Sequence, residues 1–234
     1  DSNPYATPEA SLERNIITKE GQGSLEGGLN GDYDFTIGEI YREAWGETNG
    51  VKGKFLMAWG LYMGIAMAIS WLFYFLPFDS QGILESLVNI PVLYPIMAGI
   101  TLMGIHHSVG ADINARSVFD HYGKVVPISL LTILMMFLVI LGMVLLIIPG
   151  VYLAIAYMMA LSLMMDRDMG VWESLETSRK AITKHWFKIF FIYFLLGLLM
   201  IIAMLPLFIG LIWVLPMSSV MHGIMYKKMF GVES

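Results

Sequence analysis

Apolar residues gather in six long runs that are separated by short polar connections. Most of these runs approach the roughly 20 residues that an α-helix needs to cross the core of a bilayer. They cover about residues 55–77, 87–105, 125–148, 151–165, 187–205 and 210–226. The pattern therefore predicts an all-α, polytopic membrane protein with six transmembrane helices arranged as three hairpins.

A shorter amphipathic segment precedes each predicted hairpin, at residues 35–47, 113–123 and 170–186. These segments are too short and too polar to span a membrane, so we expect them to lie as helices in its interface. In the first of them, Thr36 and Glu39 have the spacing of a capping box. The recurrence favours one unit used three times. Aromatic and basic flanks, which any membrane hairpin tends to have, are the simpler explanation.

Composition supports the membrane assignment. Apolar residues make up 57% of the chain and charged residues 14%, whereas a soluble domain carries about 25% charged residues. The formal charge of −5 comes from residues 1–34, and the remaining chain is balanced. Without a net basic surface, no nucleic-acid partner is expected. The absence of cysteine excludes disulfides and thiolate metal sites.

Residues 1–34 are polar and rich in turn-forming residues, and they hold too few apolar side chains to form a core. We expect an acidic, low-complexity cytoplasmic tail, followed by a six-helix membrane domain over residues 35–234. The tail either docks on a partner or folds back on the cytoplasmic face of its own domain. The sequence does not separate these two alternatives.

The distribution of basic residues predicts the orientation. Lys and Arg are absent from the connections at residues 78–86, 149–150 and 206–209. Because short cytoplasmic loops retain positive charge, the N- and C-termini are both expected in the cytoplasm.

His222 is the ionisable side chain that stands out within the predicted spans, and Ser218 and Ser219 precede it by about one helical turn. These three residues form the candidate polar intramembrane site. Ion-coupled transporters normally retain buried acids, Arg or Lys. We therefore interpret His222 as a packing residue that is hydrogen-bonded to Ser218 or Ser219.

Enzymatic and metal-binding roles have weaker support. His107 and Asp112 have the His-x4-Asp spacing of glycerolipid acyltransferases, in which the acid orients a histidine base. Asp112 and Arg116 suggest lipid phosphotransferases, but those enzymes need several acids to hold metal ions. His106, His107 and His121 are candidate imidazole ligands. Interfacial histidines without a chemical role are commoner, so we predict no catalytic residue, no metal site and no cofactor.

Methionine is abundant, with 19 residues. Thioethers can hold copper(I), but Met in an apolar bundle more often serves as adaptable filler. The second interpretation is favoured.

The stretch 149–190 carries a family resemblance. Its pattern includes Pro149 followed by Gly150, then Asp166, Gly170, Glu173, Leu175, Ser178 and Trp186. This stretch resembles the YciC-like group of bacterial six-helix inner-membrane proteins, a group similar to the membrane domain attached to some glycerophosphodiester phosphodiesterases. The resemblance implies a six-helix fold in the bacterial cytoplasmic membrane, and it implies no catalytic residues.

The favoured function is that of a non-catalytic accessory or scaffold subunit. It would pack against another integral membrane protein, or a second copy, and against lipid, with the tail 1–34 as a docking element. The residues expected at these contacts are Trp45, Gly60, Gly64, Ala68, Trp172, Arg179, Lys180, Lys184 and Trp186. Three of them, Gly60, Gly64 and Ala68, form a stripe of small residues that suits close helix packing.

The alternative function is that of a small-molecule permease or a lipid-handling protein. It would use the second and sixth spans, which we expect to be broken at Pro91, Pro95 and Pro216. A lipid-modifying enzyme that depends on His107 is the third hypothesis.

Overall fold

A computed structural model describes residues 22–75 and 81–233. These residues form α-helices and one 3-10 segment, η1, and they contain no strand. In chain order the elements are α1 (Leu25–Asn30), α2 (Ile37–Glu47), α3 (Lys52–Tyr74), α4 (Gln81–Ser108), η1 (Ala115–Lys124), α5 (Val125–Leu145), α6 (Ile147–Ala156), α7 (Ala160–Arg167), α8 (Val171–Lys184), α9 (Trp186–Met204) and α10 (Leu211–Phe230). The all-α expectation is confirmed for the described residues.

Among residues 22–75 and 81–233, five segments are long and apolar enough to cross a membrane, and they make the chain a multi-pass membrane protein. They are Lys52–Tyr74, Leu84–Ser108, Ala115–Leu145, Ile147–Arg167 and Trp186–Met204. The predicted span at 210–226 falls in α10, which is not among the five. Its serines, its histidine and its two terminal lysines lower the hydropathy of that helix.

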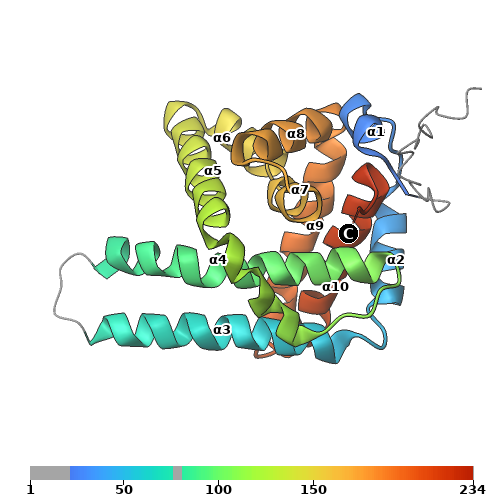
Figure 1. Cartoon of the computed structure of the whole chain (residues 1–234). Helices are drawn as coiled ribbons and strands as arrows, with labels where there is room; N and C mark the ends of the chain where they lie inside the picture. The colour runs from blue at the N-terminus through green and yellow to red at the C-terminus, as the bar shows by residue number, and fades with distance from the viewer. Residues whose placement is uncertain (1–21, 76–80, 234) are drawn as a thin grey trace, which may run out of the picture.

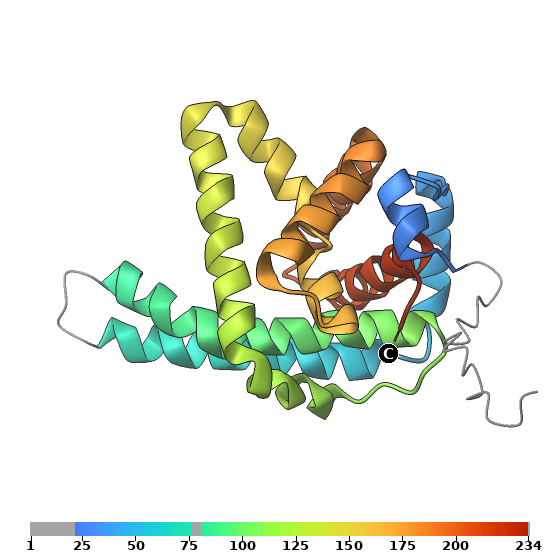
Figure 2. The same ribbon diagram turned by 45° about the horizontal axis from the view of Figure 1, so that its top comes forward.

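The helices diverge from a common base. Figures 1 and 2 show α3 and α4 side by side as one long hairpin, while α5 leaves that hairpin at a steep angle and α6 returns beside α5. The far half of the α3/α4 hairpin stands clear of the other helices. Accordingly, the exposed large apolar side chains include Met67, Trp71 and Leu72 near the end of α3.

Helix α10 is the centre of the core. Its second half is almost entirely buried, with Tyr226 and Phe230 among the largest fully buried side chains. It crosses α4 so closely that a β-carbon added to Gly223 would overlap the carbonyl of Gly104, and one added to Gly104 would overlap the carbonyl of Ser219. Glycine at both positions is what permits this approach of two backbones.

The prolines do not break the helices that contain them. Helix α4 continues through Pro91 and Pro95, and α10 continues through Pro216. The expectation of broken second and sixth spans is therefore wrong. The packing of α4 against α3, α10 and η1 maintains its helical path, and Tyr122 of η1 donates a hydrogen bond of 2.7 Å to the carbonyl of Val92 within the proline-bearing stretch.

The interfacial segments differ in kind. The first is helix α2, and its capping box is confirmed: Thr36 Oγ1 accepts from the Glu39 N–H at 3.2 Å, and Glu39 Oε2 accepts from the Thr36 N–H at 2.8 Å. The second, predicted over 113–123, is the 3-10 segment η1 rather than an α-helix. The third is α8, and Ser174, Thr177 and Ser178 on it are buried.

Residues 22–34 fold onto the domain instead of forming a separate tail. The N–H of Gly23 donates to the carbonyl of Lys227 at 2.9 Å, and helix α1 packs against α8 and α10. Tyr33 is buried, and Asp34 pairs with Lys188 at 2.7 Å. For residues 22–34 these contacts agree with the expected alternative in which the tail folds back on its own domain, and they move the boundary from residue 34 to an earlier position. The remainder of the predicted tail, residues 1–21, lies outside the described residues.

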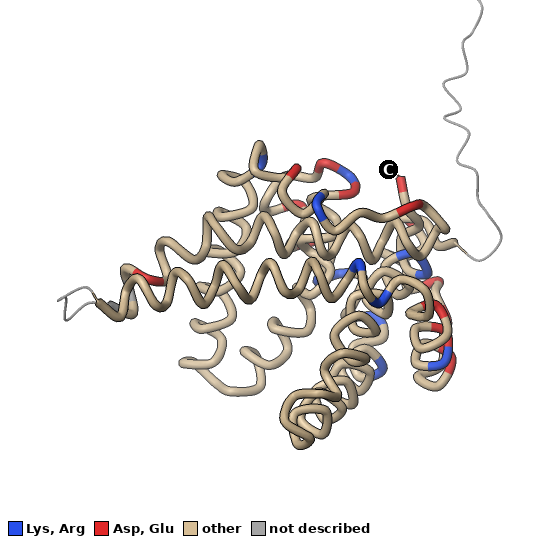
Figure 3. Tube along the Cα trace, turned by 90° about the horizontal axis from the view of Figure 1, so that it is seen from below, with Lys and Arg blue, Asp and Glu red and all other residues tan. Residues whose placement is uncertain are grey.

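Ion pairs gather where the helix ends meet. Lys54 pairs with Asp112 at 2.6 Å, and Lys228 with Glu43 at 2.8 Å. Figure 3 shows the turns between α5 and α6 and between α9 and α10 without Lys or Arg. The charged side chains thus join segments that are distant in the chain, and the turns between α5 and α6 and between α9 and α10 contain no charged residue.

Candidate functional site

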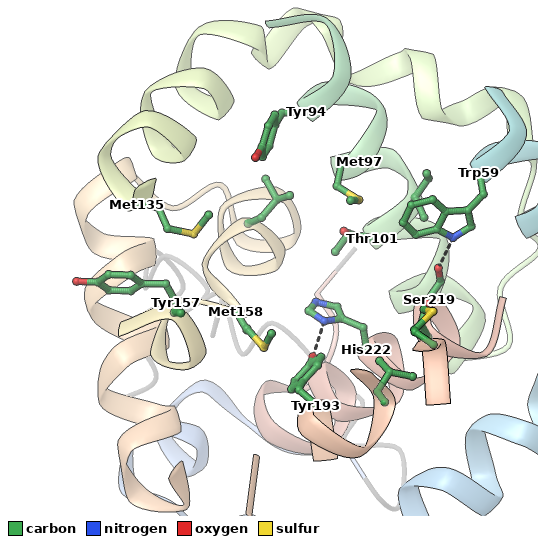
Figure 4. Close-up of a pocket in the computed structure, with 16 residues that line it drawn as sticks. Trp59, Tyr94, Met97, Thr101, Met135, Tyr157, Met158, Tyr193, Ser219 and His222 are labelled. Carbon is green, nitrogen blue, oxygen red and sulfur yellow. Dashed lines mark hydrogen bonds between the residues drawn. The ribbon is translucent and has the colours of Figure 1, made fainter. Parts of the chain in front are cut away.

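A cavity of about 460 Å³ lies where the diverging helices part, between α4, α9, α10 and the connection from α6 to α7. Its volume falls within the range of about 300–1,000 Å³ that is typical of small-molecule sites. The side chains that line it, all within the described chain, include no Lys, Arg, Asp or Glu. Methionine, tryptophan and tyrosine side chains form half of its wall, and Thr101 and His222 face its interior (Figure 4).

His222 connects three helices through its ring. Its Nε2 lies 2.7 Å from the hydroxyl of Ser162 on α7, and its Nδ1 lies 2.8 Å from the hydroxyl of Tyr193 on α9. A neutral imidazole offers one donor and one acceptor, whereas each hydroxyl can serve in either role. In either tautomer, therefore, one hydroxyl donates to the ring and the other accepts from it and keeps its own proton for a further bond.

The two serines beside His222 have other partners. Ser218 donates to the carbonyl of Leu215 at 2.7 Å, and Ser219 accepts from the indole N–H of Trp59 at 3.0 Å. The expected pairing of His222 with Ser218 or Ser219 is thus wrong. Nevertheless, all three residues line the same cavity, because i, i+1 and i+4 on α10 turn toward one side.

One wall of the cavity comes from a break in the predicted fourth span. Residues 157–159 separate α6 from α7, although no glycine or proline occurs between residues 151 and 169. Ser178 on α8 bonds two backbone groups at this break. Its hydroxyl donates to the Ala156 carbonyl at 2.7 Å and accepts from the Met159 N–H at 3.2 Å. The break places Tyr157 and Met158 on the cavity wall.

The small-residue stripe on α3 faces away from the rest of the chain. A β-carbon added to Gly60 or Gly64 would meet open space, and Ala68 is exposed. On the other side of the same helix, Trp59 and Tyr62 pack toward the core. The stripe therefore packs against nothing within the described chain.

The other predicted contact residues divide into exposed and internal ones. Trp45 and Trp172 are exposed, at 53% and 61%, with the Lys52 ammonium 5.9 Å from the Trp45 ring. Trp186 packs inward, since its indole N–H donates to the carbonyl of Tyr152 at 3.2 Å. Lys184 is exposed, although the base of its side chain lies against Gly31, where an added β-carbon would overlap it.

The basic residues of α8 are largely paired along the helix. Arg179 makes two hydrogen bonds to Glu176, at 2.9 and 2.7 Å, and Lys180 approaches the same carboxylate at 3.4 Å. The bond from Arg179 lowers the pKa of the Glu176 carboxyl. Arg179 and Lys180 therefore share the Glu176 carboxylate.

His107 and Asp112 have separate partners in the structure. A ring nitrogen of His107 lies 2.9 Å from the carbonyl of Glu47, whereas Asp112 pairs with Lys54 at 2.6 Å. The hydrogen bond from Lys54 lowers the pKa of the Asp112 carboxyl. A base oriented by its neighbouring acid is therefore not present in this arrangement.

Several residues that line the cavity or bond to His222 could not be identified from the sequence. Ser162, Tyr193, Trp59 and Thr101 lie on four other helices, and only the fold brings them to His222 and Ser219. The sequence around an aromatic or hydroxyl residue in an apolar helix does not indicate which distant residue it will contact.

Comparison of the chain with family models, curated proteins and solved structures finds no match.

Proposed function

We propose that the chain is a non-catalytic accessory or scaffold protein of the bacterial cytoplasmic membrane, similar in plan to the YciC-like group. Under this proposal α10 serves as the sixth span, the helices act as three hairpins, and both termini are cytoplasmic. The lack of Lys and Arg at the far turns supports this orientation. The resemblance over residues 149–190 supports the family assignment.

The observation that carries this function is the unoccupied face of α3. Gly60 and Gly64 have open space in front of them and Ala68 is exposed, while the opposite side of the helix is packed. In lipid, close contact between helices depends on small residues that let the backbones approach. A transmembrane helix of another protein, or of a second copy, is the partner that fits this face.

Native mass spectrometry of protein extracted in a mild detergent tests the proposal. Gly64→Leu should remove the partner from the complex, because the added side chain holds the two helices apart. Gly197→Leu is the matched control, since Gly197 is also an open helical glycine, on α9. Complex formation that Gly64→Leu and Gly197→Leu leave equally intact would contradict the proposal.

A lipid-handling protein or permease is the second candidate, and the cavity favours it. Both α4 and α10 contribute to the lining, through Thr101, Ser219 and His222 among others. Reconstituted protein should then move a fluorescent lipid across liposome membranes faster than protein-free liposomes do. Ala154→Phe, which fills the cavity from α6, should abolish that movement. Equal rates with and without protein would exclude this candidate.

A further inference from the structure

We propose that the cavity beside His222 is a binding site for one uncharged amphiphile, which has an apolar chain and a single hydrogen-bonding end group such as a hydroxyl. This inference goes beyond the accessory role. It shares the cavity with the lipid-handling candidate but does not require that the ligand be moved across the membrane.

The charge of the lining selects an uncharged ligand. Lys, Arg, Asp and Glu are absent from the side chains around the cavity, all of them in the described chain. A buried carboxylate, phosphate or ammonium without an opposite charge carries a large desolvation penalty. A neutral polar group needs only hydrogen-bond partners, and the lining supplies these.

The wall selects a flexible apolar chain. Met97, Met135, Met158 and Met200 line the cavity together with aliphatic and aromatic side chains. Methionine is unbranched and adaptable, so it can follow a chain that has no fixed shape. The cavity volume of about 460 Å³ far exceeds the roughly 30 Å³ of one water molecule, and cavities with apolar walls do not hold water well.

The polar end group would meet a cluster of hydroxyls and the imidazole. The hydroxyls of Thr101 and Tyr94 face the cavity (Figure 4) and make no hydrogen bond within the described part of the chain. Beside them, Tyr193 shares a hydrogen bond with His222. In the Ser162–His222–Tyr193 chain, the hydroxyl that accepts from the ring still has its own O–H to donate to another group. Thr101 faces the same cavity as His222 in Figure 4. Both ring nitrogens of His222 already have hydroxyl partners, so the Thr101 hydroxyl is the group that can donate to and accept from a ligand hydroxyl there.

Photolabelling of the full chain in lipid nanodiscs tests this inference. Two diazirine probes of equal chain length are compared, a long-chain fatty alcohol and the corresponding fatty acid, at neutral pH. The alcohol should label peptides that contain Met97 or Met158, at least several-fold more strongly than the acid. Thr101→Val should lower labelling by the alcohol about 3- to 10-fold, the effect of one lost hydrogen bond.

Thr132→Val is the control, because Thr132 also lies within a helix but its hydroxyl bonds its own backbone, the carbonyl of Ile128, at 2.9 Å. Ala154→Phe is the second variant, and it should abolish labelling by occupying the cavity without changing a polar group. Equal labelling by alcohol and acid, or labelling that neither Thr101→Val nor Ala154→Phe reduces, would overturn the inference. Because Thr101 is remote from the open face of α3, the partner complex should survive Thr101→Val, so the two proposals fail separately.

Discussion

Tyr33 donates a hydrogen bond from its hydroxyl to the backbone carbonyl of Ala181, 2.9 Å away, although 148 residues separate them. The Tyr33 ring also meets the edge of the His185 ring, with centroids 5.0 Å apart. Together these contacts attach the segment before α2 to the end of α8. The N-terminal segment from residue 22 is therefore part of the folded domain.

Tyr33→Phe should destabilise the protein by about 1–2 kcal/mol, because it leaves the buried Ala181 carbonyl without the partner it has in the native fold. The midpoint of thermal unfolding in detergent measures this loss. Tyr74→Phe is the control, since Tyr74 is exposed at the end of α3. If the two variants have equal midpoints, Tyr33 does not anchor the segment.

Ser178→Ala should cost more than Ser174→Ala, although both serines are buried on α8. Ser178 is the hydrogen-bond partner of two backbone groups in the α6–α7 break. Loss of the Ser178 hydroxyl should cost roughly 2–6 kcal/mol, at about 1–3 kcal/mol for each of the two unsatisfied groups. The Gly170 carbonyl that Ser174 contacts still accepts from the Ser174 N–H, so Ser174→Ala should cost below about 1 kcal/mol. Chemical denaturation of the two variants checks the difference, and a cost for Ser178→Ala no greater than that for Ser174→Ala would contradict it.

Gly223→Ala should be strongly destabilising, by about 2 kcal/mol or more, because the added methyl group would meet the backbone of α4 at Gly104. Gly197→Ala makes the same change in an open helical position. There alanine should be neutral or stabilising by up to about 1 kcal/mol through its helix propensity. Thermal unfolding of both variants provides the test, and similar midpoints would rule out a tight crossing of α4 and α10.

Glu47 and Glu176 should respond to pH in opposite directions. Burial raises the pKa of the Glu47 carboxyl, and Lys227 opposes the shift most, while Glu43 adds to it and His107 and Lys228 reduce it. A raised pKa means that the folded state loses stability as pH rises through that pKa. Glu47→Gln should therefore stabilise the protein at neutral pH, and the gain should vanish below about pH 4.

For Glu176 the sign is reversed. The bond from Arg179 lowers its pKa, so its contribution is present above the unfolded value and disappears as pH falls through the folded value. Glu176→Gln should then destabilise the protein at neutral pH and have little effect in acid. Thermal midpoints measured across pH for both variants decide the matter, and parallel curves for the two would contradict these assignments.

Local features were predictable from the sequence, and contacts between distant segments were not. The capping box of Thr36 and Glu39 involves residues three apart, so the spacing alone was sufficient to predict it. The partners of His222 lie 60 and 29 residues away, and spacing on α10 pointed instead to Ser218 and Ser219.

The helix breaks show the same limit. Pro91 and Pro95 are local signals of a break, but packing keeps α4 continuous. The actual break at 157–159 depends on Ser178, a residue of the next helix. Similarly, glycine spacing on α3 suggested a packed stripe, whereas the close crossing within the chain uses Gly104 and Gly223.

Photo-crosslinking in native membranes tests the proposed packing face most directly. A photoreactive amino acid replaces Gly64 on the open face of α3, and in a second variant it replaces Gly197 on α9. The account predicts a crosslink from position 64 to a second polypeptide, either another membrane protein or another copy of this chain, and none from position 197. Crosslinks to lipid alone at position 64, or equal polypeptide crosslinks at both positions, would contradict it.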